Sequence, residues 1–366
     1  MNPETENWIE NSGELKRFAK EGKLKMKTLK AEGFRMPAEW HEHEATWLSW
    51  PKDPDTFPPN IIDNVENIYC QMIAALQEGE KVKILVDDEK WENKVRKKFE
   101  SKGMNDENII FYHIKSIDVW TRDYAPIFVV NKKDKKITAV KWIFNAWGDK
   151  YDVLLHDSYA GEQIAKASGY DVSEPKIVLE GGSIDVNGAG ELITTEQCLL
   201  NKKRNPQLTK KQIEKYLKDY LGIDTVIWLK EGIEGDDTDG HVDDITRFVN
   251  ENTVITMVEE NKSDKNHKPL KENLEILKKN GLDVIELPMP SKIAIPERRL
   301  PASYANFYIG NNCVLLPVFK DKNDEKAINT LQECFPNKKV VPIYARDLVY
   351  GYGGIHCVTM QEPKIN

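Results

Sequence analysis

The chain contains 366 residues, of which 40% are hydrophobic and 31% are charged, enough to bury a large core. Its formal net charge of −8 at pH 7 argues against nucleic acid as a partner, because phosphate binding needs a concentrated basic surface. A small cationic ligand suits this acidic balance better. The five cysteines are an odd number without a CxxC pair, which disfavours a disulfide framework and a zinc ribbon.

The first residues are polar and rich in lysine, and we expect a charged arm over residues 1–34, followed by one large domain over residues 35–366. The sequence shows neither the apolar core of a signal peptide nor a long apolar span. We therefore expect a cytoplasmic location and no membrane partner. The oligomeric state is not readable from the sequence, which leaves a homo-oligomer open.

Along the chain, apolar runs of strand length recur, each bounded by turn residues. Between several of them lie helical patterns with apolar residues three and four positions apart, as in 64–79 and 271–281, the second closed by Gly281. Strands that alternate with helices predict an α/β protein. The expected strands lie within residues 81–88, 108–114, 125–131, 136–144, 176–182, 225–229, 253–260, 283–290 and 312–319.

Polar loops rich in Gly, Asp, Trp or Pro recur at nearly even intervals. Their marker residues are Asp123, Glu180, His241, Pro301 and Cys357. The intervals are about 60 residues, a period that fits one supersecondary unit per repeat. We expect each unit to deliver one loop to a common centre, where the loops would form a site.

The last of these loops, GGIHC, carries a thiol beside glycines. A cysteine in such a place can be an inert buried residue or a nucleophile, and a nucleophile needs an acid or base from elsewhere in the chain. The segment EGDDTDGHVDDITRF offers His241 for that role. We do not expect His356 to serve, because adjacent side chains of an extended segment point to opposite faces.

The acidic residues around His241 allow metal binding as an alternative. An EF-hand register that places Gly240 at its sixth position puts Gly235 first and Thr246 twelfth, so calcium is disfavoured. A transition metal lacks an HxH or HExxH ligand pair. The pattern therefore predicts no metal.

A guanidinium substrate fits these residue types better. It is a planar cation that stays protonated at neutral pH, so carboxylates must hold it. Asp123 and Asp243 come from different loops, as a clamp that exposes the central carbon to the Cys357 thiolate would require. His241 would protonate the departing nitrogen and later deprotonate water, and Glu180 is the predicted carboxylate that orients its ring.

At this point the sequence resembles a known family in six ordered blocks. The chain resembles the agmatine deiminases, within the wider group of guanidine-modifying enzymes that includes bacterial peptidylarginine deiminases. The blocks are MPAEWHEHEATWLSWP, DVWTRDYAPIFVVN, LEGGSIDVNGAGELITTEQCLLNKKRNP, DDTDGHVDDITRF, LPASYANFYI and GGIHCVTMQEP.

The resemblance implies a five-bladed α/β propeller of ββαβ units. It also implies hydrolysis of agmatine to N-carbamoylputrescine and ammonia through a covalent thiouronium on Cys357, without a metal or organic cofactor. In these terms His241 is the acid and base, Glu180 is its partner, and Asp123 and Asp243 bind the guanidinium.

Around this set the pocket differs from the commonest family pattern at Tyr124, Ala125 and Met360. The predicted substrate contacts are Trp120 beside the methylene chain, Asp237 facing the distal ammonium, and Gly354 in a tight turn near the substrate; packing or capping roles are the alternatives. Arg122 and Arg247 are predicted as internal ion-pair partners of the acids.

Three other functions stay open at this stage. The first is deimination of free or peptidyl arginine, whose carboxylate would need an arginine or lysine in the pocket. The second is a catalytically silent homologue that binds a cation or a partner protein. The third is a metal-dependent hydrolase.

Overall fold

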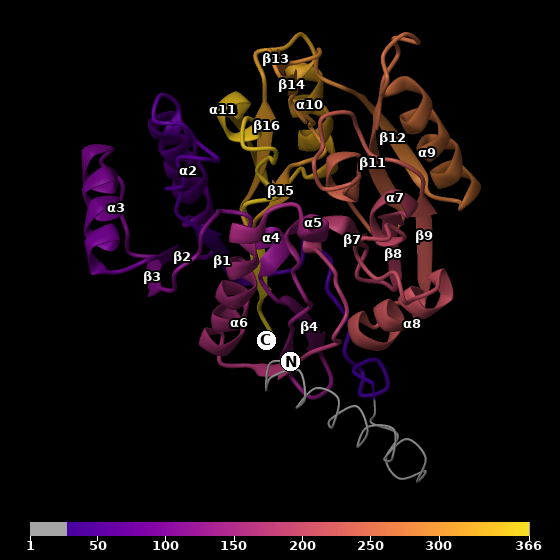
Figure 1. The fold of residues 1–366 in the computed structure, drawn as a ribbon, viewed down its shortest axis with the longest axis horizontal. Coiled ribbons are helices and arrows are strands. Elements are labelled where there is room, and N and C mark those ends of the chain that lie inside the picture. Colours follow the sequence, from indigo (N-terminus) through magenta and orange to yellow (C-terminus); the bar gives the residue numbers. More distant parts are fainter. Residues whose placement is uncertain (1–27, 366) are drawn as a thin grey trace, which may run out of the picture.

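The computed structural model describes residues 28–365, and over this range the protein has a mixed α/β fold (Figure 1). Five sheets of three or four strands follow one another, together with a two-stranded hairpin. In each three-stranded sheet the first strand pairs antiparallel with the second, and the second pairs parallel with the third. A helix connects each parallel pair, as parallel strands require.

The sheets are built from strands in the following orders. The first sheet runs β18 (Met360–Pro363), β1 (His43–Ser49), β2 (Lys81–Val86) and β3 (Ile109–His113). The second sheet runs β4 (Ile127–Asn131), β5 (Lys136–Val140) and β6 (Asp171–Ser173). The third sheet runs β7 (Ile184–Val186), β8 (Glu191–Thr195) and β9 (Thr225–Leu229). The fourth sheet runs β10 (Thr246–Phe248), β11 (Thr253–Val258) and β12 (Asp283–Pro288). The fifth sheet runs β15 (Tyr308–Ile309), β16 (Cys313–Val318) and β17 (Lys339–Tyr344). The hairpin pairs β13 (Ala294–Ile295) with β14 (Arg298–Arg299).

The connecting helices are α2 (Ile62–Leu76), α3 (Glu89–Ser101), α6 (Asp157–Ala167), α8 (Lys210–Leu221), α9 (His267–Lys279) and α10 (Asp324–Cys334). Their ends follow from local sequence. In α8, Thr209 and Gln212 form a reciprocal capping box, and Gly222 ends the helix with φ 70°. Short helical turns complete the chain: α4 (Thr121–Tyr124), α5 (Ala146–Asp149), η1 (Asp152–His156), η2 (Gly181–Ser183), α7 (Glu196–Leu199), η3 (Val242–Asp244) and α11 (Arg346–Val349).

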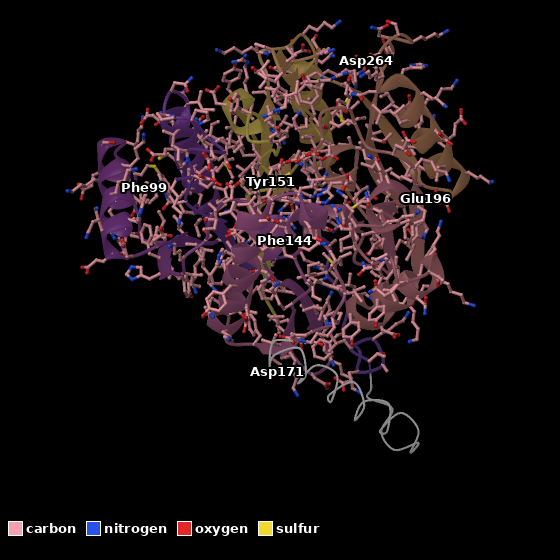
Figure 2. The ribbon with its side chains drawn as sticks, viewed as in Figure 1. Phe99, Phe144, Tyr151, Asp171, Glu196 and Asp264 are labelled. Atoms are coloured by element: carbon pink, nitrogen blue, oxygen red, sulfur yellow. The ribbon has the colours of Figure 1, made fainter. Side chains whose placement is uncertain are left out.

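The short turns and the long helices occupy different places. In Figure 1, α4 and α5 lie near the middle of the view, whereas α3, α8 and α9 lie at its edge. The side chains in Figure 2 follow the same division, with Tyr151 and Phe144 near the centre and Asp171 and Asp264 toward the outside. All residues of α4 and three of the four residues of α5 are buried, so these short turns reach the interior, as the repeated polar motifs predict.

The predicted strand over residues 176–182 is wrong. This segment makes only an isolated bridge from Val178 to Ile143, and β6 provides the third strand of the sheet instead. The amide of Asn205 donates to the carbonyl of Val178 at 2.8 Å and accepts from its N–H at 3.0 Å. A side chain thereby satisfies the backbone groups that a neighbouring strand would otherwise satisfy.

The predicted arm over residues 1–34 lies largely outside the described residues, and only 28–34 can be placed. There, Leu29 packs against the core, and the N–H of Lys30 donates to the carbonyl of Asp219 at 3.0 Å. Within residues 28–365, no helix combines the length and apolar character needed to cross a membrane.

Candidate active site

A cavity of about 650 Å³ opens beside the C-terminal loop. Its walls include Cys357, Asp123, Trp120 and Asp237, four of the predicted site residues. They come from three separate parts of the chain, so tertiary structure brings them together. This is the convergence that the evenly spaced polar loops predict.

Cys357 lies in a turn between α11 and β18, with the residue only 5% exposed but lining the cavity. Its Sγ lies 3.7 Å from Oδ2 of Asp243 and accepts a hydrogen bond from Nδ2 of Asn306 at 3.2 Å. The Oδ1 of Asn306 accepts from the N–H of His356 at 2.9 Å. One amide therefore holds both the sulfur and the backbone of its loop.

Two glycines before Cys357 allow this close packing. A Cβ at Gly354 would lie 2.4 Å from Oδ1 of Asn306, and one at Gly353 would lie 2.3 Å from the ring of Trp120. Only Gly353 of this pair lines the cavity. The structure thus places Gly354, a predicted substrate contact, against Asn306, where it makes room for the amide.

The surroundings of Cys357 favour the neutral thiol in the empty site. Burial raises the pKa of the thiol well above its ordinary value, and the nearby Asp243, Asp244 and Asp123 raise it further. A cation bound between the carboxylates would oppose this effect. The arrangement therefore couples ionisation of the sulfur to occupation of the site.

Asp123 lies in α4 and is fixed by two donors. Its Oδ1 accepts from the N–H of Gly182 at 3.1 Å, and its Oδ2 accepts from Nε1 of Trp147 at 2.9 Å. Burial raises its pKa to about 6, with Asp243 and Glu180 adding to the effect and His241 opposing it. The carboxylate is ionised at neutral pH and faces the cavity.

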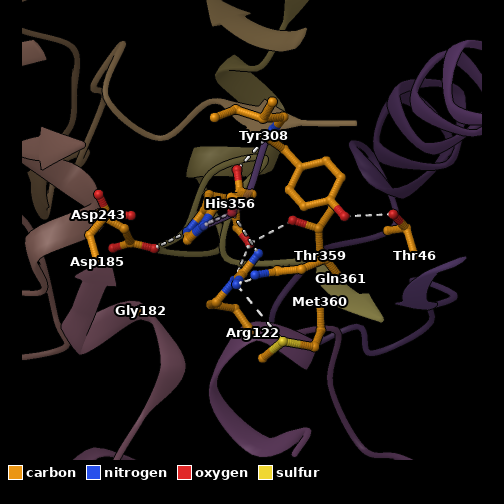
Figure 3. Close-up of polar contacts among 12 residues, drawn as sticks. Thr46, Arg122, Gly182, Asp185, Asp243, Tyr308, His356, Thr359, Met360 and Gln361 are labelled. Atoms are coloured by element: carbon orange, nitrogen blue, oxygen red, sulfur yellow. Dashed lines mark hydrogen bonds and ion pairs between the residues drawn. The ribbon is translucent and has the colours of Figure 1, made fainter. Parts of the chain in front are cut away.

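Asp243 lies in η3 and is held by His356. Nδ1 of His356 lies 2.7 Å from Oδ2 of Asp243, and Nε2 lies 2.8 Å from Oε2 of Glu39. Figure 3 shows the ring of His356 directed toward Asp243. Burial alone would raise the pKa of Asp243, but the hydrogen bond and charge of His356 outweigh it and keep the pKa below its ordinary value.

Glu39 connects this pair to the two predicted internal arginines. Its Oε1 accepts from Arg247 at 2.9 Å, and its Oε2 lies 3.3 Å from Nη2 of Arg122. Arg247 also pairs with Asp185 at 3.0 Å, and all of these side chains are buried. The prediction that both arginines are ion-pair partners is confirmed.

An extended segment around Cys357 predicts that its neighbour His356 does not serve as the acid or base. The structure instead has a turn over residues 355–358. The ring of His356 is bound by Glu39 and Asp243, so it supports a site carboxylate from behind.

His241 precedes η3, with its side chain buried and both ring nitrogens without a hydrogen-bond partner. Nδ1 lies 3.8 Å from Oδ1 of Asp123. Burial lowers the pKa of the imidazole, but Asp123, Cys198 and Asp243 together raise it well above its ordinary value. The ring is therefore positioned and charged to donate a proton.

Gly182 lies where the predicted acid and carboxylates meet. A Cβ at this position would lie 2.6 Å from Nδ1 of His241 and 3.0 Å from both Asp123 and Asp243. The glycine thus leaves the space that these three groups share. This contact is independent support for the predicted convergence of the three side chains.

Glu180 is buried next to His241 but does not form the predicted hydrogen bond in this structure. Its Oε1 accepts from Nε of Arg204 at 2.5 Å, and its Oε2 has no partner. Glu180, Cys198 and His241 place their donor atoms within 4.8 Å of one another. Asp243, Asp244 and Cys357 form a second group with metal-ligand chemistry.

The two remaining predicted substrate contacts line the cavity. Nε1 of Trp120 donates to Asp118 at 2.8 Å, which fixes the ring in the wall. Asp237 accepts from the hydroxyl of Tyr151 at 2.5 Å and lies 3.6 Å from Nζ of Lys150. The carboxylate of Asp237 therefore already has a hydrogen-bond partner and a nearby cation within the protein.

Sequence reasoning missed three side chains that fix the site, namely Asn306, Trp147 and Arg204. Asn306 lies within the block LPASYANFYI, whose polar residues could have suggested a role. Arg204 lies in the block that also contains Glu180. Nothing in the sequence around Trp147 indicates that its N–H reaches Asp123.

Comparison with known proteins agrees with this geometry. A Mycoplasma capricolum protein, provisionally named as an agmatine deiminase, is 36% identical over 363 residues, covering 92% of this chain and 97% of the relative. An agmatine deiminase of Enterococcus faecalis, described as catalyzing its reaction, has a TM-score of 0.84 and 33% identity, covering 93% of this chain and 99% of the other.

A further solved structure is a C. jejuni agmatine deiminase with a cysteine-to-serine substitution and substrate bound. It has a TM-score of 0.81 and 33% identity, covering 90% of this chain and 96% of the other. The family model of the Porphyromonas-type peptidyl-arginine deiminases matches residues 35–363. Cys357 and Asp123 line one cavity, and His241 lies 3.8 Å from Asp123. The chain belongs to the Porphyromonas-type peptidyl-arginine deiminase family, which here includes relatives named as agmatine deiminases.

Proposed function

We propose that this protein is an agmatine deiminase that hydrolyses agmatine to N-carbamoylputrescine and ammonia. The observation that carries the proposal is the position of Cys357, whose sulfur lies 3.7 Å from Asp243 in a cavity that Asp123 also lines. A thiol next to two carboxylates from separate loops fits attack on a bound guanidinium carbon. The names of the relatives at 33–36% identity support the same substrate.

In the first half of the reaction, the guanidinium binds between Asp123 and Asp243, and the thiol of Cys357 releases its proton to solvent. The sulfur then bonds to the guanidinium carbon. The protonated His241 donates its proton to one amino group, the C–N bond breaks, and ammonia leaves. A positively charged thiouronium stays attached to Cys357.

In the second half, the now neutral His241 takes a proton from water, and the oxygen bonds to the same carbon. The C–S bond then breaks and returns the electron pair to sulfur, while the hydroxyl proton leaves as the urea carbonyl forms. That proton converts the released ammonia to ammonium. The protonated His241 is restored, and the Cys357 thiolate regains a proton from solvent; no metal takes part in either step.

The cavity wall favours a substrate with a second positive charge. Beyond Asp123, its acidic residues outnumber its basic ones, since the only Lys or Arg among the lining residues is Arg298. Agmatine carries an ammonium at the end remote from the guanidinium, which an acidic wall attracts. The acidic residues in question are Asp53, Asp55, Asp118, Asp237 and Glu297.

Arg298 supports a second candidate, the deimination of free or peptidyl arginine. It lines the cavity, stacks on the ring of Tyr352 at 3.5 Å, and leaves its buried Nη1 without a partner. This nitrogen could bind the carboxylate that arginine has and agmatine lacks. Substrate preference therefore has a structural test in Arg298→Leu.

We also infer that the five sheets are the blades of a propeller and that residues 35–366 form one catalytic domain behind an arm over 1–34. Support comes from the repeated strand pairing and from β18, near the C-terminus, which pairs with β1. A cytoplasmic location and a lack of nucleic-acid and membrane partners are further parts of the proposal.

The deciding experiment is an ammonia-release assay with agmatine, free arginine and a peptide ending in arginine. We expect a strong preference for agmatine, no turnover by Cys357→Ala, and a covalent adduct on Cys357, detected by intact mass, with a slowly hydrolysed substrate. An adduct on another cysteine would overturn the assignment. A preference for arginine that Arg298→Leu abolishes would establish the second candidate.

A further inference from the structure

Close to His241 lies a second thiol, Cys198, for which the proposed reaction has no use. It lies in α7, is fully buried, and its backbone N–H donates to the hydroxyl of Thr195 at 3.1 Å. Its Sγ, a ring nitrogen of His241 and a carboxylate oxygen of Glu180 all lie within 4.8 Å of one another. Sulfur, imidazole and carboxylate thus meet at one point.

Two of these three side chains have atoms without partners. Both ring nitrogens of His241 and Oε2 of Glu180 are buried and make no hydrogen bond within the described residues. Buried polar atoms are normally paired, so such a group indicates a site that something else can fill. The adjacent Arg204 donates to the other oxygen of Glu180. Its Nη1 also donates to Oδ2 of Asp239 at 2.8 Å, so this arginine interacts with two carboxylates.

The donor set selects the type of ion. Thiolate and imidazole favour Zn²⁺ and similar transition metals, whereas Mg²⁺ and Ca²⁺ require oxygen ligands. In tetrahedral zinc sites the donor atoms lie about 3.4–3.6 Å apart, given Zn–S near 2.3 Å and Zn–N near 2.1 Å. The donor atoms of Cys198, His241 and Glu180 lie within 4.8 Å of one another. To bind one zinc ion, each pair of donor atoms has to approach by at most about 1.4 Å, a movement that two side chains can share.

We propose that Cys198, His241 and Glu180 form an inhibitory site for Zn²⁺ and chemically similar ions. Binding forms one bond to each side chain. The thiol of Cys198 and the imidazolium of His241 each release one proton to solvent as the metal–sulfur and metal–nitrogen bonds form. Three protein ligands are the number at zinc sites that keep an open position. An ion can approach from the cavity, since Asp123 lines it and lies 3.8 Å from His241.

A bound metal would inhibit the enzyme because it takes up the nitrogen lone pair of His241. The ring could then neither donate a proton to the leaving nitrogen nor accept one from water. This consequence rests on the proposed function, whereas metal binding itself does not. The two can therefore be tested by separate measurements on the same protein.

The binding test is titration of the full-length protein with Co²⁺, monitored by the near-ultraviolet cobalt–thiolate charge-transfer band. We expect the band in the wild type and in Cys357→Ala, and its loss in Cys198→Ser and Cys198→Ala. Cys70→Ser, which changes another buried thiol in α2, should keep the band. A band that persists without Cys198, or that is lost in Cys357→Ala, would overturn the proposal.

The activity test uses Zn²⁺ with ammonia release as the readout. Measured relative to its own turnover without added metal, Cys198→Ser should need at least tenfold more Zn²⁺ for half inhibition than the wild type or Cys70→Ser. Excess EDTA should restore the inhibited wild type. Equal sensitivity of all three proteins would refute an inhibitory role. A protein that shows the cobalt band but deiminates none of the substrates would contradict the proposed function and leave the metal site established.

Discussion

Replacing His356 by asparagine tests how the site keeps Asp243 ionised. Both ring nitrogens of His356 lie within hydrogen-bond distance of a carboxylate, 2.7 Å from Asp243 and 2.8 Å from Glu39. The hydrogen bond and the electrostatic attraction of His356 lower the pKa of Asp243 and so stabilise its ionised form.

The size of the effect follows from these contacts. A hydrogen bond between charged groups contributes roughly 1.5–3 kcal/mol, which corresponds to about one to two pKa units. The pKa of Asp243 is held low in the folded protein, so it is ionised at neutral pH. Without the His356 ring, the pKa of Asp243 rises. On acidification, Asp243 therefore loses its charge at a higher pH than in the wild type. Breaking the buried pair should also lower the free energy of unfolding by about 3–5 kcal/mol.

The assay is the pH dependence of kcat/KM for ammonia release, together with denaturant unfolding. We expect the acid limb of the profile to become steeper, because the raised pKa of Asp243 brings its protonation toward the range near 6 in which Asp123 already titrates. The matched control is His113→Asn, because His113 pairs with Glu92 at 2.8 Å on the surface, where such pairs contribute about 1 kcal/mol or less. A variant that is less stable but has an acid limb of unchanged steepness would refute this role of His356.

Four further outcomes can be checked with standard assays. Gly182→Ala should lower kcat about 100-fold with unchanged circular dichroism, because its Cβ would lie 2.6 Å from Nδ1 of His241; near-normal activity would contradict this geometry. Asn306→Ala should lower kcat about tenfold by removing the donor 3.2 Å from Cys357, and an unchanged kcat would show that the amide is dispensable. Alkylation of Cys357 by iodoacetamide in the free enzyme should accelerate as the pH rises past about 9, since its pKa is raised; a rate already maximal at neutral pH would mean a preformed thiolate. EDTA should leave turnover undiminished, and a loss of activity would favour a metal-dependent hydrolase.

Residue types and local order were enough to select the candidate reacting groups. The sequence places a thiol, an imidazole and two carboxylates in loops at similar intervals, and the apolar runs between them predict most strands and the longer helices. Such features are local, because a strand or helix is recognised from the spacing of its own apolar residues. The family resemblance added an activity and a role for each residue.

The tertiary structure decided which groups touch. Asn306 reaches Cys357 across 51 positions of the chain, and Trp147 reaches Asp123 across 24, contacts that depend on how separate loops fold together. The same holds for His356, whose ring lies between Glu39 and Asp243 because its segment forms a turn. Glu180 pairs with Arg204 rather than with His241, and segment 176–182 forms no strand because Asn205 satisfies its backbone. Hydrogen bonds between distant loops depend on three-dimensional distance, which a pattern of residue types along the chain does not contain.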